Sequence, residues 1–217
     1  MFPQSREHGP ARTEYDSLGP VSVPFGALYG APTERAVRNF PISGVPISQL
    51  PDLIRALAPI KKAAARVNVK AAHLTEEKAN IISRVCDEII AGQHRQHFPI
   101  DVFQGGAGTS SNMNMNEVIA NRGLELMSRN CGDYDHLHPN NDVNRSQSTN
   151  DVYPTAIRMA LMMSVPGLIE AMEALAGAFE EKGQVFSGIR KLGRTELQDA
   201  VPMTLGSEMS AYGVTIR

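Results

Sequence analysis

The chain has 217 residues, of which 42% are hydrophobic and 20% are charged, and its formal net charge is -2. These proportions indicate a globular protein with a substantial core and exclude an intrinsically disordered chain. Lys and Arg are scattered among Asp and Glu, so the basic patch that binds nucleic acid or an anionic membrane is excluded as well. The expected partners are small molecules or other protein chains.

The sequence lacks the features of secreted and membrane proteins, which predicts a cytoplasmic location. The N-terminal stretch MFPQSREHGPARTEYDSLGP lacks the apolar core of a signal peptide, and no apolar run approaches the roughly eighteen residues of a membrane span. Cys86 and Cys131 have no CxxC spacing, so we expect neither a disulfide framework nor a zinc site. The sequence thus predicts no metal and no membrane contact.

The first half of the chain predicts an extended arm followed by paired helices. Residues 1–20 are rich in Gly and Pro and predict a loose arm, and VSVPFGALYG predicts a strand or turn against the body. From Ser48, apolar residues at helical spacing predict a helix of about twenty residues. A second helix is expected to be capped by Thr75 and to stop at Gly92. The apolar positions of the first helix are Leu53, Ile54, Leu57, Ile60, Ala64 and Val67.

The second half alternates polar segments with helical patterns. A third helix is predicted to start near Ser111, and the long polar loop 132–151 follows it. An apolar stripe then predicts a bundle helix up to about Glu181, with a kink at Pro166. After the polar segment 188–203, a last helix is expected from Thr204 and the pattern breaks off at Arg217, as in a fragment. The predicted fold is mainly α, with domains 1–144 and 145–217.

Two clusters of small hydrogen-bond donors stand at predicted helix N-termini. The stretch GGAGTSSNMNMNEV begins at Gly105 and carries Thr109, Ser110, Ser111 and Asn112; the second cluster is Ser148, Thr149 and Asn150. Free backbone N–H groups and the helix dipole make such places anion sites. Neutral donors suit a carboxylate that gains charge in a transition state. The alternative interpretation is ordinary helix capping, which uses the same residue types.

Other candidate sites carry weaker signals. His136 and His138 in HLHPNN have side chains that bind metals or anions, but such loop histidines are more often solvated or bonded to backbone. The GGAG stretch does not fit a dinucleotide fingerprint, because the G-x-G-x-x-G pattern and a parallel-sheet context are both missing. No metal or organic cofactor is therefore predicted.

Taken together, three segments resemble the conserved blocks of the aspartase and class II fumarase superfamily. They are GGAGTSSNMNMNEVIANR, HPNNDVNRSQSTNDVYPTA and GRTELQDAVPMTLG, and VPFGALYGAPTERAVRNFPISG is similar to the segment that precedes the first helices of that family. The resemblance covers the chain from about residue 17. It implies the N-terminal helical domain of the fumarase and aspartase fold, followed by the first part of a central helix bundle.

The resemblance also implies site residues and an assembly. The family binds its dicarboxylate substrate in active sites built from three subunits of a homotetramer and needs no cofactor for the chemistry. The substrate-binding positions that match are Gly108, Thr109 and Ser110 in the first block, Ser148, Thr149 and Asn150 in the second, and Thr195 in the third. A second dicarboxylate site of the fumarases matches His138, Asn140 and Asn141, although Asn141 stands where they usually have Asp.

The variants within the blocks favour the branch that releases ammonia from L-aspartate to give fumarate. Class II fumarate hydratase is the alternative, and a non-catalytic oligomerising fragment is another. Glu196 departs from the His or Gln common at its position. A carboxylate there opposes a dianionic substrate unless it is protonated, paired with a cation, or used to hold the ammonium of the substrate. Glu196 is therefore a candidate catalytic-site residue, and the last option favours an amino-acid substrate.

The chain is also short for this family. Its members run to about twice this length, and the C-terminal loop that carries the general base has no counterpart in these 217 residues. The resemblance implies anti elimination, in which that base takes a Cβ proton and Thr109 and neighbouring donors hold the β-carboxylate. This chain is thus expected to supply donors and to be inactive alone.

Overall fold

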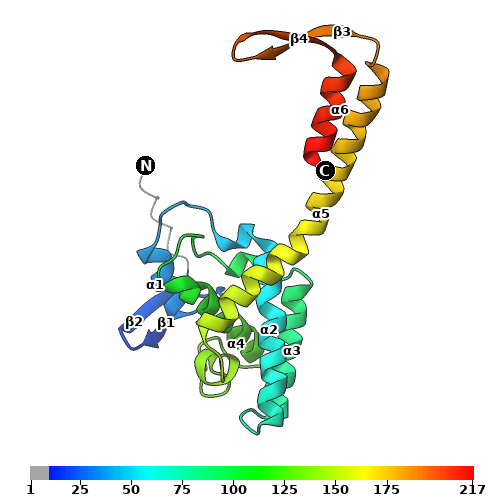
Figure 1. Ribbon diagram of the computed structural model, residues 1–217. Coiled ribbons are helices and arrows are strands. Elements are labelled where there is room, and N and C mark those ends of the chain that lie inside the picture. Colours follow the sequence, from blue (N-terminus) through cyan, green and yellow to red (C-terminus); the bar gives the residue numbers. More distant parts are fainter. Residues whose placement is uncertain (1–9) are drawn as a thin grey trace. The chain divides into compact units, whose positions relative to one another are not determined.

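The computed structural model describes residues 10–217, and its elements are mainly helical, which confirms the predicted fold class (Figure 1). The chain forms two compact units that divide between Leu161 and Met162. This division lies inside helix α5 (Thr149–Val185), so the first turns of that helix belong to the first unit. The expected domain boundary after residue 144 stays a prediction.

The first unit opens with a β-hairpin instead of a loose arm. Strands β1 (Ala11–Asp16) and β2 (Gly19–Pro24) pair antiparallel, so the prediction for residues 11–20 was wrong, and residues 1–9 lie outside the described part. The hairpin is fixed by polar contacts that the sequence pattern does not reveal. Arg12 donates to the carbonyls of Ala27 and Tyr29, and Glu14 is 4% exposed.

Two antiparallel helices confirm the expected pair. After α1 (Ala31–Asn39) and the short η1 (Ile47–Gln49), helix α2 (Pro51–Lys70) packs along α3 (Glu76–Ile90), as Figure 1 shows. The Thr75 side chain accepts a hydrogen bond from the Lys78 N–H and so caps α3, as predicted. Short helical turns follow at η2 (Arg95–His97) and η3 (Gly106–Gly108).

Helix α4 (Thr109–Leu126) is the centre of the first unit and starts two residues before the predicted position. It contacts α1, α2, α3 and the π-helical turn η4 (Pro139–Val143), so it is covered on several sides. Neighbours on several sides explain why α4 buries polar as well as apolar side chains. The polar and charged ones are Ser111, Asn112, Asn114, Asn116, Glu117 and Asn121.

The second unit contains the end of α5, a hairpin and a last helix. The polar segment 188–203 forms strands β3 (Arg190–Thr195) and β4 (Gln198–Thr204), which the sequence analysis missed. Their side chains are mostly exposed, so no alternation of buried apolar residues marks them. Helix α6 (Leu205–Ile216) begins as expected, where Thr204 and Ser207 form a capping box.

Helix α5 is more apolar than the sequence analysis allowed. It is one continuous helix through Pro166, and among residues 10–217 it is the one helix long and apolar enough to cross a membrane by length and composition. The expectation that no segment approaches that length was therefore wrong. Only 6% of its most apolar stretch is buried in this structure. Long helices in the cores of soluble proteins meet the same two criteria, so the finding is weak evidence for a membrane.

Candidate functional site

The first block forms a tight loop that leads directly into α4. Gly106, Ala107 and Gly108 all have positive φ, at 67°, 51° and 86°. No side chain caps α4 at Gly108, and the Thr109 hydroxyl instead donates to the Gly106 carbonyl at 2.6 Å. The Thr109 N–H also donates to the Gly106 carbonyl, so the N–H groups that follow it in the first turn of α4 are the ones without a partner inside the helix. This arrangement suits an anion.

The second block forms the start of α5. Ser148 Oγ accepts a hydrogen bond from the Asn150 N–H at 3.2 Å, while the Ser148 carbonyl accepts from Asp151 and Val152. Ser148 thus closes the first turn of the helix in the manner of a cap. Ser148 and Asn150 are exposed and Thr149 is half-buried. The side chains of Thr149 and Asn150 take no part in this cap.

The structure brings the first two blocks together. The buried amide of Asn112 donates from Nδ2 to Thr149 Oγ1 at 3.1 Å and so joins α4 to α5. Gly108 and Asn150 line one open pocket of about 470 Å³, and the ring of Tyr153 forms part of its wall. The remaining lining residues are Val102, Gln104, Ala107, Pro154 and Ile157. Gly108 of the first predicted cluster and Asn150 of the second thus line one pocket.

A buried lysine is connected to the first two blocks by hydrogen bonds. Lys61 is fully buried on α2, and its Nζ donates to Asn144 Oδ1 at 2.8 Å. Asn144 Oδ1 also accepts from Asn112 Nδ2 at 3.1 Å. Burial lowers the pKa of Lys61 to about 7. The sequence analysis missed Lys61 and Asn144, although a lysine four residues after Leu57 on a buried helix face was a usable signal.

The third block lies in the second unit. Thr195 and Glu196 stand at the turn of the β3–β4 hairpin, where Glu196 and Leu197 both have positive φ, at 47° and 64°. Two such residues between paired strands form a type I′ turn. Both Thr195 and Glu196 are exposed. The contacts described for the first unit therefore unite the first two blocks only.

The residues of the expected second site form a turn of their own. His138 Nδ1 accepts hydrogen bonds from the Asn140 and Asn141 N–H groups, at 2.9 and 3.1 Å, and caps η4. Partial burial lowers the pKa of His138, which favours the neutral ring that this acceptor role requires. The backbone N–H groups of Asn140 and Asn141 are thus already bonded within this turn. The second dicarboxylate site stays a prediction.

Residues 10–217 contain no group of three or more His, Cys, Asp or Glu side chains that is arranged to hold a metal ion. Cys86 is buried and Cys131 is half-buried, and neither forms a disulfide. The donor set of the candidate site consists of hydroxyls, amides and backbone N–H groups, which fit a carboxylate better than a cation.

Comparison with known proteins identifies the family. The family described as "Lyase" matches residues 19–217. The chain belongs to this lyase family. The match includes all three blocks, so the resemblance seen in the sequence is confirmed.

Individual lyase relatives agree with this assignment. The aspartate ammonia-lyase of Pseudomonas aeruginosa is 52% identical over 95% of the chain, and that of Escherichia coli K12 is 48% identical over 95%. The alignments cover 44% and 43% of those proteins, so the chain spans less than half the length of these relatives.

Solved lyase structures share the fold. A structure titled fumarate lyase:delta crystallin from Brucella melitensis superposes with a TM-score of 0.90 at 54% identity, covering 96% of this chain and 48% of that one. A class II fumarase from Schistosoma mansoni superposes with a TM-score of 0.81 at 34% identity, covering 95% and 43%. The fold expected from the resemblance, an N-terminal lyase portion, is thereby confirmed.

Proposed function

We propose that the protein carrying this chain is a carbon–nitrogen lyase that eliminates ammonia from L-aspartate to give fumarate. The observation that carries the proposal is the identity of about half of all aligned residues with aspartate ammonia-lyases across almost the whole chain. The joined blocks supply the physical part: an uncapped helix N-terminus that Asn112 links to the Thr149 hydroxyl at the start of α5. The substrate class is a small dicarboxylate, and no cofactor takes part in the proposal.

The chemistry assigned to this chain is binding and charge stabilisation. Removal of a Cβ proton places a second negative charge on the β-carboxylate, and preorganised N–H and O–H groups stabilise that charge more in the transition state than in the ground state. The first turn of α4, which no side chain caps, offers backbone N–H groups for this purpose, and Gly108 and Asn150 place the first and second blocks on one pocket. The general base belongs to a segment outside these residues.

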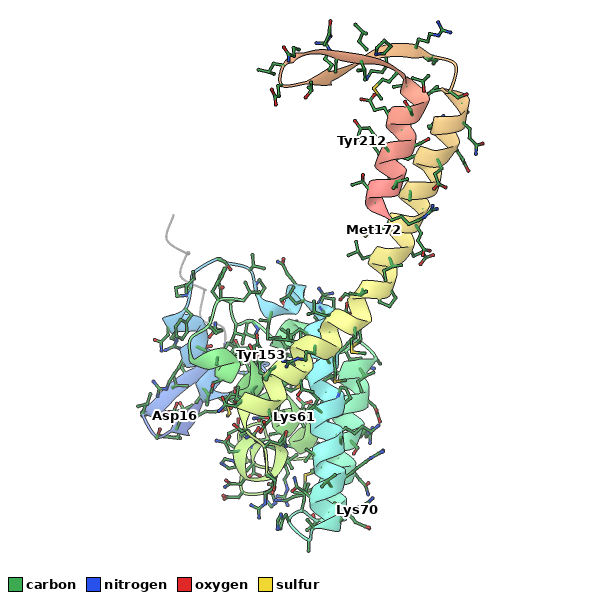
Figure 2. All side chains as sticks on the ribbon, viewed as in Figure 1. Asp16, Lys61, Lys70, Tyr153, Met172 and Tyr212 are labelled. Atoms are coloured by element: carbon green, nitrogen blue, oxygen red, sulfur yellow. The ribbon has the colours of Figure 1, made fainter. Side chains whose placement is uncertain are left out.

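We also place the protein in the cytoplasm as a homotetramer. The apolar side chains along α5 support an assembly, because Leu168, Ile169, Met172 and Leu175 are each at least 40% exposed. A continuous apolar face of this size favours contact with other helices. Figure 2 shows Met172 on the part of α5 that belongs to the second unit.

The proposed reaction predicts a simple substrate preference. The complete gene product should form fumarate, followed by its ultraviolet absorbance, when L-aspartate is added and not when L-malate is added. The 217-residue chain serves as a control that should be inactive. Turnover of L-malate alone would instead establish a fumarate hydratase, the candidate favoured by the match to the Schistosoma mansoni fumarase.

Glu196 gives a second prediction for the same assay. If its carboxylate holds the substrate ammonium, Glu196→Gln should raise KM for L-aspartate about tenfold, because a charge-assisted hydrogen bond becomes a neutral one. The dicarboxylate succinate has no ammonium, so its inhibition constant should stay the same or fall. An unchanged KM for L-aspartate in Glu196→Gln would remove the residue from the site.

A further inference from the structure

The Thr149 hydroxyl is fixed in one direction by a chain of hydrogen bonds that starts at Lys61. An ammonium group can only donate, so Asn144 presents its Oδ1 to Lys61 at 2.8 Å. Asn144 Nδ2 donates to the Gln147 carbonyl at 3.2 Å, which agrees with this orientation. The amide of Asn144 therefore has one orientation that satisfies its neighbours.

The orientation passes on to α4 and α5. Because Asn144 Oδ1 is an acceptor, Asn112 turns its Nδ2 toward it, at 3.1 Å, and the same Nδ2 reaches Thr149 Oγ1 at 3.1 Å. The Thr149 oxygen accepts there, so its own proton is left to donate elsewhere. Within residues 10–217 that proton has no acceptor. Thr149 thus offers its O–H to a ligand.

The charge of Lys61 adds to this arrangement. In residues 10–217 no acidic side chain forms an ion pair with Lys61: the nearby carboxylates Asp87 and Asp142 pair with Lys62 and Lys78. Cys86 faces it from α3, and burial raises the pKa of that thiol to about 12, so it stays neutral. A buried charge without a counter-ion is costly. An anion bound at the adjoining site would relieve that cost.

We propose that Lys61 is a positioning residue of the anion site, which directs the Thr149 hydroxyl toward a bound dicarboxylate and supplies positive potential behind it. Lys61 itself is fully buried, so it acts through Asn144 and Asn112 and not by touching the ligand. Figure 2 labels Lys61 on α2 and Tyr153 on α5. The inference rests on the proposed function for the class of ligand, a dicarboxylate.

The test measures binding of succinate, an unreactive dicarboxylate, to the complete gene product by calorimetry. Lys61→Met keeps the length of the side chain and removes its charge; we expect succinate affinity to fall at least tenfold. Lys62→Met is the matched control, since Lys62 is the next residue and pairs with Asp87 away from this chain of hydrogen bonds. Its affinity should remain within twofold of wild type. Equal affinities of the two variants would overturn the proposal.

Two further measurements separate positioning from a general loss of structure. Thr149→Val should weaken succinate binding in the wild-type background and have little further effect in Lys61→Met, because the first change removes the hydroxyl donor and the second removes its orientation toward the ligand. Wild-type affinity should fall as the pH rises above about 7, where Lys61 loses its proton, whereas Lys61→Met should lack this step. Independent effects of the two substitutions, together with identical pH profiles, would contradict the proposal.

Asn144→Asp provides a variant that keeps the lysine and cancels its charge. The new carboxylate would pair with the ammonium in place of the neutral oxygen, so succinate affinity should fall as in Lys61→Met. If Asn144→Asp binds succinate as tightly as the wild type does, the proposal that the charge of Lys61 supports binding is wrong. Failure of the proposed reaction is distinguishable, because it appears as absence of L-aspartate turnover in the wild-type protein while succinate binding still reports on Lys61.

Discussion

Glu117→Gln should stabilise the first unit at pH 8 and change its stability little at pH 5. Glu117 is buried in the middle of α4, where its Oε2 accepts hydrogen bonds from the Gly30 and Thr33 N–H groups at 3.0 and 3.3 Å. Burial raises the pKa of this carboxyl to about 8, and the charge of Glu14 acts in the same direction. Glutamine resembles the neutral acid in shape and accepts the same two hydrogen bonds.

The sign follows from proton linkage. Between its ordinary pKa of 4.5 and the folded value of about 8, Glu117 holds a proton in the folded state that the unfolded state has released. Stability therefore falls as the pH rises through this window, by at most about 1.4 kcal/mol per pH unit. His97, His138 and Lys61 also have shifted pKa values. Their contributions are the same in both proteins and cancel in the difference between variant and wild type.

Urea unfolding followed by circular dichroism at pH 5, 6.5 and 8 measures this difference. Glu125→Gln is the control, because it makes the same charge change at an exposed position of the same helix. We expect the stability of Glu117→Gln relative to wild type to increase with pH, and that of Glu125→Gln to stay level. Parallel curves for wild type and Glu117→Gln would show that the folded protein accepts the charged carboxylate.

The same network holds the N-terminal hairpin against the body of the unit. Glu14 Oε2 accepts from the Tyr134 hydroxyl at 2.9 Å and from the Ala31 N–H at 3.1 Å, and Arg12 pairs with its other oxygen. A Cβ on Gly30 would lie 2.4 Å from Glu14 Oε2 and 3.0 Å from Glu117 Oε1, so both carboxyl groups line one small space. Burial, together with these neighbouring charges, raises the pKa of Tyr134, which keeps it a donor.

These contacts show why the arm was mistaken for a loop. Periodicity detects elements that bury apolar side chains, and it predicted α2, α3 and the start of α6 well. Strand β1 is instead fixed by the buried ion pair of Arg12 with Glu14 and by hydrogen bonds from Arg12 to distant carbonyls. The partners lie up to 120 residues apart, as Glu14 and Tyr134 do. No local pattern encodes such pairs.

The candidate site was predictable in its donors and not in their support. Thr149 and Asn150 are polar residues at the start of a helix, and the local sequence pattern predicts hydrogen-bond donors at that place. Lys61 lies about ninety residues earlier, on a helix whose polar positions normally face water. The burial of Lys61 depends on Asn144, which the folded loop places beside α2. The two residues are 83 positions apart in the sequence. Only the tertiary structure brings the two together.

Gly108→Ala should disrupt the junction of the two blocks, while Gly106→Ala should cost much less. Both glycines have positive φ, at 86° and 67°, so each alanine carries the steric cost of the left-handed region, roughly 1–2 kcal/mol. The two positions differ in space. A Cβ on Gly108 would lie 2.2 Å from Cδ1 of Tyr153, whereas a Cβ on Gly106 meets nothing closer than 3.4 Å.

The ring of Tyr153 must therefore move when Gly108 gains a methyl group. Overpacking of this kind adds roughly 1–3 kcal/mol of destabilisation. The movement also displaces the wall of the pocket that Gly108 and Asn150 share, so binding of succinate to the complete gene product should fall at least tenfold in Gly108→Ala. Gly106→Ala should bind succinate within about threefold of wild type, since the pocket wall stays in place.

A double substitution identifies the cause. Tyr153→Ala removes the ring that the new methyl group meets, so Gly108→Ala should cost only its left-handed strain in that background. The free energies of unfolding of the four proteins, measured by urea denaturation, give the coupling directly. A destabilisation by Gly108→Ala that is the same with and without the Tyr153 ring would mean that backbone strain alone makes this position intolerant. In that case glycine is required at position 108 by its backbone conformation and not by the close contact with the Tyr153 ring.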